Sequence, residues 1–224
     1  MFCARGGTAL GRVLEHLTDD HWRRIAASTP RWVVGSSDIT ALHSAIAARV
    51  GWATLFAPML ATDVLCGEQP DGVSRAALHR ALFAGSASVS ASQVLSSGTD
   101  TVEAPMVGGT VTVIESLLAT PEAGSAEGCI ALLEDIGEPP RRLDRSLTHL
   151  RRAGWFAGVR GVVIGTLIDC GASAQDVVLE RVSDLGVPVL MNVNLGHGPC
   201  QLSFPLGARV RMDTRTASVT WSVD

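Results

Sequence analysis

Three residues in this sequence, Ser37, Glu134 and His197, each follow an apolar segment or lie in a glycine-rich loop. A serine hydroxyl becomes a nucleophile when a base takes its proton, and histidine is the side chain that titrates nearest neutral pH. A glutamate can fix the tautomer of that histidine and stabilise the imidazolium that forms. The chain order Ser, Glu, His is compatible with that of other α/β serine hydrolases. The three residue types therefore point to nucleophilic catalysis.

The surroundings of Ser37 predict a strand, a sharp turn and a helix. A short apolar strand ends at Val34, Gly35 can adopt backbone angles that other residues resist, and Asp38 or Thr40 can cap the helix that follows. A serine at such a corner points its hydroxyl away from the sheet, and the positive end of the helix faces the same space. The alternative is that the Ser-Asp pair is an ordinary helix cap.

Glu134 and His197 are placed by different signals. Glu134 and Asp135 end a buried strand that covers residues 129–133, and ligands of open α/β sheets bind at the carboxyl ends of strands. His197 lies between two glycines, so its ring is free to face a cleft. The alternatives are that the two acids cap a helix or form a solvated pair, and that His197 is a surface or turn histidine.

Composition excludes several other classes of function. The chain has 224 residues, of which 46% are hydrophobic and 18% charged, with a net charge of -4, so we expect a soluble globular protein and no nucleic-acid partner. The five cysteines are widely spaced, which favours reduced thiols in a cytoplasmic protein. No zinc-binding spacing and no membrane-length apolar run occur, so we expect neither a metal site nor a membrane partner.

Strands and helices alternate along most of the chain and predict an α/β fold. The expected organisation is a first domain over residues 1–83, an interdomain linker over residues 84–107 and an α/β domain with a β-rich tail over residues 108–224. The linker is predicted because residues 84–99 are rich in Ser, Ala and Gly and contain few large apolar residues. Residues 1–3 are expected to be the end of a strand that runs straight into a glycine turn.

An ordered set of short motifs, running from residue 1 to about residue 210, resembles the LD-carboxypeptidase family of serine peptidases. That family includes muramoyltetrapeptide carboxypeptidases and microcin-immunity peptidases. The matching motifs are Arg5-Gly6-Gly7, Gly35-Ser36-Ser37-Asp38-Ile39-Thr40-Ala41-Leu42-His43, Ala57-Pro58-Met59, Gly108-Gly109-Thr110, Leu133-Glu134-Asp135-Ile136-Gly137-Glu138, Asp144-Arg145, Gly165 and Gly196-His197-Gly198.

The resemblance implies a fold and an activity. The first domain would be a partial flavodoxin-like or Rossmann-like domain with the nucleophile Ser37, and the second would carry Glu134 and His197. The reaction would be hydrolysis of an amide next to a free carboxylate, commonly the L,D bond of a murein tetrapeptide, with release of D-alanine. The implied partner is a small peptide or muropeptide, no metal or organic cofactor is expected, and homodimers are common.

The resemblance also assigns groups around the nucleophile. The amides of Asp38 and of Gly7 or Gly6 would hold the oxyanion, and removal of one such donor typically costs about 2.7–4 kcal/mol of barrier. Arg5 would meet the terminal carboxylate of the substrate. The alternative is that Arg5 braces the glycine turn.

Some positions depart from the family pattern. The family has aromatic residues where Ser36 and Thr8 stand, and His-Gly where Phe56-Ala57 stands, so the walls of the cleft and the substrate choice are expected to differ. Family members carry βα units before the Arg-Gly-Gly turn, so we expect an N-terminally truncated chain with an unpaired sheet edge. Two further hypotheses follow: a relative that binds peptides without turnover, and a structural fragment without activity.

Overall fold

The structure is a computed structural model that describes residues 1–95 and 98–223. The helices are α1 (Leu10–Leu14), α2 (Asp19–Ala26), η1 (Ser37–Ile39), α3 (Thr40–Val50), α4 (Asp63–Cys66), α5 (Gly72–Phe83), α6 (Val111–Ser116), α7 (Pro140–Arg152), α8 (Ala174–Val182) and η2 (Ser183–Leu185). The strands are β1 (Val34–Gly35), β2 (Thr54–Phe56), β3 (Ser86–Ser90), β4 (Gln93–Leu95), β5 (Thr101–Thr110), β6 (Ile130–Ile136), β7 (Gly161–Ile168), β8 (Val189–Met191), β9 (Phe204–Leu206), β10 (Arg209–Asp213) and β11 (Ser218–Ser222). None of these helices is both long and apolar enough to cross a membrane.

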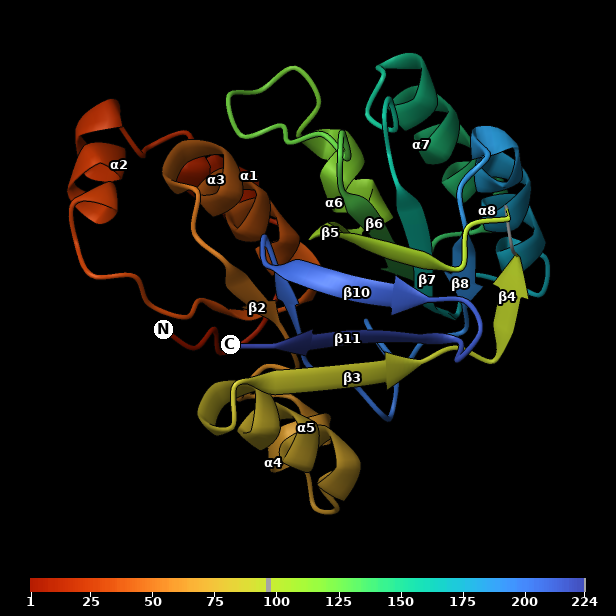
Figure 1. Cartoon of the computed structure of the whole chain (residues 1–224). Helices are drawn as coiled ribbons and strands as arrows, with labels where there is room; N and C mark the ends of the chain where they lie inside the picture. The colour runs from red at the N-terminus through yellow and green to blue at the C-terminus, as the bar shows by residue number, and fades with distance from the viewer. Residues whose placement is uncertain (96–97, 224) are drawn as a thin grey trace.

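A large sheet with the strand order β3-β11-β10-β5-β6-β7-β8-β4 forms the centre of the molecule. Strands β5 to β8 run parallel, and helices α6, α7 and α8 lie together along this part of the sheet (Figure 1). Strand β6 is buried at every residue but its last, as expected for a parallel strand that is covered on both faces. The carboxyl ends of β6 and β7 therefore lie next to each other, where a ligand site is expected.

The two edge strands of this sheet, β3 and β4, are consecutive in sequence. Only Ala91 and Ser92 separate them, so the sheet has to curl until its two edges approach each other. The Ala91 amide donates to the Ala217 carbonyl at 2.8 Å, and the Ser92 amide donates to the Met191 carbonyl at 3.2 Å. These bonds join the β11 side of the sheet to the β8 side.

The segment 84–107, predicted to be a linker, consists largely of strands β3, β4 and the first part of β5. Its small residues alternate in burial, with Ala87 and Val89 inside and Ser88 and Ser90 outside. This period of two is the pattern of a strand with one solvated face, which small side chains made hard to recognise. The division of the chain into two domains stays a prediction.

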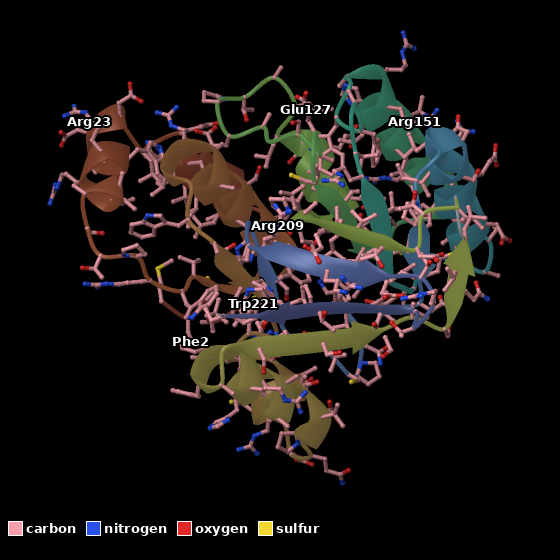
Figure 2. The ribbon with its side chains drawn as sticks, in the orientation of Figure 1. Phe2, Arg23, Glu127, Arg151, Arg209 and Trp221 are labelled. Carbon is pink, nitrogen blue, oxygen red and sulfur yellow. The ribbon has the colours of Figure 1, made fainter. Side chains whose placement is uncertain are left out.

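A small sheet, β1-β2-β9, carries the predicted nucleophile turn at the end of β1. Phe2 pairs in parallel with Val34 of β1, which agrees with the strand expected at the start of the sequence. Trp32 contacts Trp221 of β11, with ring centroids 5.9 Å apart and planes at 84°. Figure 2 shows Trp221 at the end of β11 near this sheet, with Phe2 below it. Apolar packing thus connects the two sheets.

The C-terminal region contains β9, β10 and β11, so the α/β class with a β-rich tail is confirmed. Strand β9 begins at Phe204, and the residues just before it do not belong to a strand. The amide of Gln201 donates to the Ser74 hydroxyl at 2.8 Å instead of to a strand. The segment before β9 is therefore held on helix α5, close to the loop that contains His197.

Candidate active site

Ser37 lies on a strained turn between β1 and α3. Its φ angle is +62°, in the left-handed region that residues other than glycine seldom adopt, and its side chain is partly exposed. Backbone strain of this kind is concentrated at functional sites, and the nucleophile of α/β hydrolases lies on a similar strand-to-helix turn. Ser37 therefore lies at a sharp turn where its side chain is accessible, and its backbone is not that of a residue inside a regular helix.

The glycine turn at residues 5–7 packs directly on Ser37. A Cβ atom at Gly6 would lie 2.8 Å from Ser37 Cβ and 3.0 Å from Ser37 Oγ, so only glycine allows this approach. The Cβ position of Gly7, where φ is +151°, lies 3.6 Å from Asp38 Oδ2. Arg5 is exposed and forms no ion pair with the other described residues.

Asp38 and Thr40 do not cap helix α3, which corrects the prediction from the sequence. Asp38 Oδ2 accepts hydrogen bonds from the amides of Ala9 and Leu10, at 3.1 and 3.0 Å, and so caps helix α1. The Thr40 hydroxyl contacts Thr110. The short helix η1 precedes α3, and no side chain caps the start of α3. The side chains of Asp38 and Thr40 therefore make contacts with other parts of the molecule.

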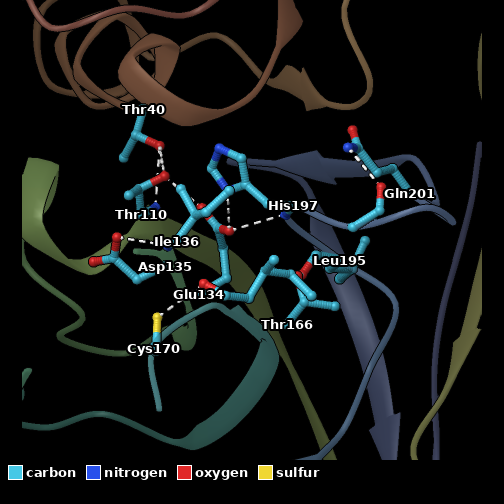
Figure 3. Close-up of polar contacts among 12 residues, drawn as sticks. Thr40, Thr110, Glu134, Asp135, Ile136, Thr166, Cys170, Leu195, His197 and Gln201 are labelled. Atoms are coloured by element: carbon cyan, nitrogen blue, oxygen red, sulfur yellow. Dashed lines mark hydrogen bonds and ion pairs between the residues drawn. The ribbon is translucent and has the colours of Figure 1, made fainter. Parts of the chain in front are cut away.

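Glu134 and His197 are in direct contact (Figure 3). Glu134 lies on β6 and is fully buried, and its Oε2 accepts from His197 Nδ1 at 2.8 Å and from the His197 amide at 3.1 Å. Because the carboxylate accepts the Nδ1 proton, the other ring nitrogen, Nε2, is left as the basic atom in the neutral ring. The His197 side chain remains 16% exposed.

The electrostatic surroundings of His197 favour its protonated form. Burial of the ring lowers its pKa, but the hydrogen bond and charge of Glu134, together with the charge of Asp135, outweigh burial and raise the pKa above the ordinary 6.5. A carboxylate in this position stabilises the imidazolium that forms when a histidine takes a proton from a hydroxyl.

Glycines allow the His197 loop to lie on Glu134. A Cβ atom at Gly196, where φ is +112°, would lie 2.3 Å from Glu134 Oε2. A Cβ atom at Gly165 on β7 would lie 2.2 Å from the Leu195 carbonyl oxygen. That carbonyl accepts a hydrogen bond from the Thr166 amide at 2.9 Å, which fixes the start of the loop.

Asp135, the neighbour of Glu134, points to a different partner. It is 1% exposed and caps helix α6, because its Oδ2 accepts from the Thr112 amide at 3.0 Å. Burial is the main cause that raises the pKa of Asp135 to about 6. The capping interpretation of the two acids therefore holds for Asp135 and not for Glu134.

Two buried threonines, Thr40 and Thr110, join the Ser37 helix to Glu134, a role that the sequence does not predict for either of them. Thr110 Oγ1 donates to Glu134 Oε1, and the Thr110 amide donates to Thr40 Oγ1 at 3.2 Å. Thr110 follows the Gly108-Gly109 pair at the end of β5, and that position beside a strand end was the signal available in the sequence. No hydrogen bond between Ser37 and His197 is found among the described residues, so the polar connection between their segments runs through these threonines.

A histidine on the other side of the Ser37 turn has a supporting role. His43 on α3 is 2% exposed, and its Nε2 donates to the Gly35 carbonyl at 2.9 Å. Burial lowers the pKa of His43 to about 4, so the ring is neutral at physiological pH. It therefore holds the strand end that precedes Ser37 and does not act as a base there.

Comparison with known proteins relates this chain to carboxypeptidases. The family model for the LD-carboxypeptidase N-terminal domain matches residues 1–57, and that for the C-terminal domain matches residues 103–212. A Streptomyces coelicolor protein assigned as a carboxypeptidase is 35% identical, over 98% of this chain and 70% of its own length. The murein tetrapeptide carboxypeptidase of Pseudomonas aeruginosa is 29% identical, over 92% of this chain and 70% of its own length.

Solved structures agree in fold. The muramoyltetrapeptide carboxypeptidase from Oxalobacter formigenes superposes with a TM-score of 0.82 at 24% identity, over 99% of this chain and 78% of that one. A microcin C7 self-immunity protein in complex with aspartyl sulfamoyl adenosine gives a TM-score of 0.82 at 22% identity, over 99% of this chain and 75% of that one. The chain described here belongs to the LD-carboxypeptidase family, a family of hydrolases with carboxypeptidase activity.

Proposed function

We propose that the chain is a serine carboxypeptidase that hydrolyses an L,D-type amide bond near a free carboxylate, through an acyl-enzyme. The substrate would be a murein tetrapeptide or a related peptide conjugate. The observation that carries the proposal is the buried Glu134 carboxylate that accepts both the Nδ1 proton and the amide of His197. The name of the Pseudomonas aeruginosa relative supports the substrate class.

Each catalytic group then has a role at a named atom. His197 Nε2 takes the Ser37 proton as Ser37 Oγ attacks the carbonyl carbon, and Glu134 stabilises the imidazolium. The amides of Asp38 and of Gly7 or Gly6 hold the oxyanion. The imidazolium returns its proton to the leaving amine, the C–N bond breaks, and water activated by His197 then hydrolyses the ester on Ser37.

The free carboxylate of the substrate requires a cation, and Arg5 is the candidate. It is exposed beside the glycine turn that packs on Ser37 and is not engaged in an ion pair with a described residue. A guanidinium binds a carboxylate through two parallel hydrogen bonds, which would fix the terminal residue next to the scissile bond. A homodimer remains part of this proposal.

Release of D-alanine from a muropeptide tests the function directly. Incubation of the chain with a murein tetrapeptide that ends in D-alanine should release this amino acid, whereas the matched peptide that ends in L-alanine should remain intact. Released alanine is measured by chromatography that separates the enantiomers. Equal hydrolysis of both peptides would contradict L,D specificity.

A second candidate is a relative that binds muropeptides without cutting them. This candidate is supported by the absence of a hydrogen bond between Ser37 and His197 among the described residues, because a serine nucleophile needs a base within reach. Saturable binding of the D-alanine tetrapeptide in calorimetry, without any released alanine, would support this candidate against the peptidase.

A further inference from the structure

Glu134 is held from two sides. Its Oε2 faces the two donors of His197, whereas its Oε1 accepts from Thr110 Oγ1 (Figure 3). Thr110 is the only partner of Oε1 in the hydrogen bonds of the described residues. The carboxylate is 0% exposed, so without Thr110 one of its oxygens would be buried with neither a protein donor nor bulk solvent to stabilise it.

Thr110 is in turn bonded to Thr40, the first residue of α3. The Thr40 hydroxyl donates to Thr110 Oγ1 at 3.4 Å, and the Thr110 amide donates to Thr40 Oγ1 at 3.2 Å. Both threonines are almost fully buried, with exposures of 1% and 4%. Each hydroxyl has one proton to donate. Because Thr40 donates to Thr110 Oγ1, the Thr110 hydroxyl can donate its own proton to Glu134 Oε1.

The close approach of α3 to β5 depends on Gly109. A Cβ atom at Gly109, where φ is +136°, would lie 2.5 Å from Thr40 Oγ1 and 3.2 Å from a ring carbon of Phe56. The chain thus has a glycine where the helix that follows Ser37 reaches β5, the strand that pairs with β6 and places Thr110 opposite Glu134. Thr40 lies one helical turn beyond Ser37, so the bridge connects the backbone of the nucleophile turn to the Glu–His pair.

We propose that Thr110 is a positioning residue, which orients Glu134 so that Oε2 faces His197 and, together with Thr40, holds the Ser37 helix against that pair. This inference rests on the proposed function. Thr110 touches neither Ser37 nor His197 through a hydrogen bond of the described residues, so it acts through Glu134.

Removal of the hydroxyl tests this role. Thr110→Val keeps the β-branched shape and loses the donor, and we expect kcat to fall about 10- to 100-fold while KM changes less than about threefold, because a buried charged acceptor loses its partner. Thr110→Ser keeps the donor and should recover kcat to within about threefold of the parent. Should Thr110→Val fail to fold, the pair Thr110→Ala and Thr110→Ser gives the same comparison.

Thr112→Val is the matched control. Thr112 lies two residues further on and directs its hydroxyl to the neighbouring Asp135, at 3.4 Å from Oδ1, instead of to Glu134. This variant makes the same chemical change next to the other carboxylate, and it should keep kcat within about twofold of the parent. A loss as large as that of Thr110→Val would assign the effect to packing and overturn the proposal.

NMR titration of His197 gives a readout that does not depend on turnover. In Thr110→Val the carboxylate loses the donor that turns its Oε2 towards His197, so the Glu134–His197 bond weakens, the His197 pKa should fall towards 6.5, and the Nδ1 proton signal should move upfield. Ser37→Ala should leave both unchanged, and Thr112→Val should move both less than Thr110→Val does. Unchanged His197 titration and unchanged kcat in Thr110→Val would overturn the inference, whereas turnover that survives in Ser37→Ala would overturn only the proposed function.

Discussion

Ser37→Ala should abolish release of D-alanine from a murein tetrapeptide while it leaves the fold intact. Removal of a nucleophile from a serine hydrolase lowers kcat by about 10⁶-fold, because the remaining groups cannot form the covalent intermediate. The Ser37 side chain is partly exposed on a turn, so the loss of its hydroxyl leaves no buried partner unsatisfied. Alanine release is measured over hours, and near-UV circular dichroism checks the fold.

Ser36→Ala is the control for this experiment. Ser36 is the adjacent serine, but it is 3% exposed, so its hydroxyl is not available to a substrate. We expect this variant to keep turnover within a few-fold of the parent. Hydrolysis by Ser37→Ala at the rate of the parent would show that the nucleophile has been assigned wrongly.

Glu134→Gln should have the second largest effect. The glutamine amide can donate to His197 Nδ1, which favours the tautomer with its proton on Nε2, and Nε2 can then no longer accept the proton of Ser37. The corresponding change in another serine hydrolase lowers kcat by about 10⁴-fold, and we expect a loss of roughly this size. Steady-state kinetics at neutral pH measures it.

The pH profile separates this electrostatic role from a structural one. His197 acts as a base only when neutral, and its pKa is raised above 6.5 in the parent, so kcat/KM should rise with pH through a limb above 6.5. Without the charge of Glu134 burial dominates, and the limb in Glu134→Gln should move to or below 6.5. Asp135→Asn, which removes the neighbouring charge but leaves the Glu134–His197 bond, should move the limb by less. An unchanged limb in Glu134→Gln would contradict the assignment.

Much of this site could be predicted because strand ends and glycines mark it in the sequence. Glu134 follows a continuous apolar run, and such a run in an alternating pattern predicts a parallel strand whose carboxyl end faces a ligand. The glycines around His197 indicated a loop with little bulk, and the structure uses Gly196 to bring that loop onto the carboxylate. The roles of Ser37, Glu134 and His197 in catalysis remain predictions.

Other features depend on long-range contacts that local patterns do not reveal. The sequence predicts a linker where strand β3 lies, because Ser and Ala form its alternating pattern and only its pairing with β11 makes it a strand. Asp38 has the sequence signature of a cap for the helix that follows it, yet it caps α1, 28 residues away from its partner Leu10. The Thr110–Glu134 bond spans 24 residues and could not be predicted from either motif alone.

A crystal structure of the chain after reaction with a serine-directed phosphonate that mimics the tetrapeptide would locate the reactive atom and its base together, and so tests whether Ser37 and His197 act as one catalytic unit. We expect phosphorus bonded to Ser37 Oγ, with His197 Nε2 at hydrogen-bonding distance from the adduct, about 2.6–3.2 Å. Ser37 and His197 on separate surfaces, or a phosphonate bonded to another residue, would contradict it.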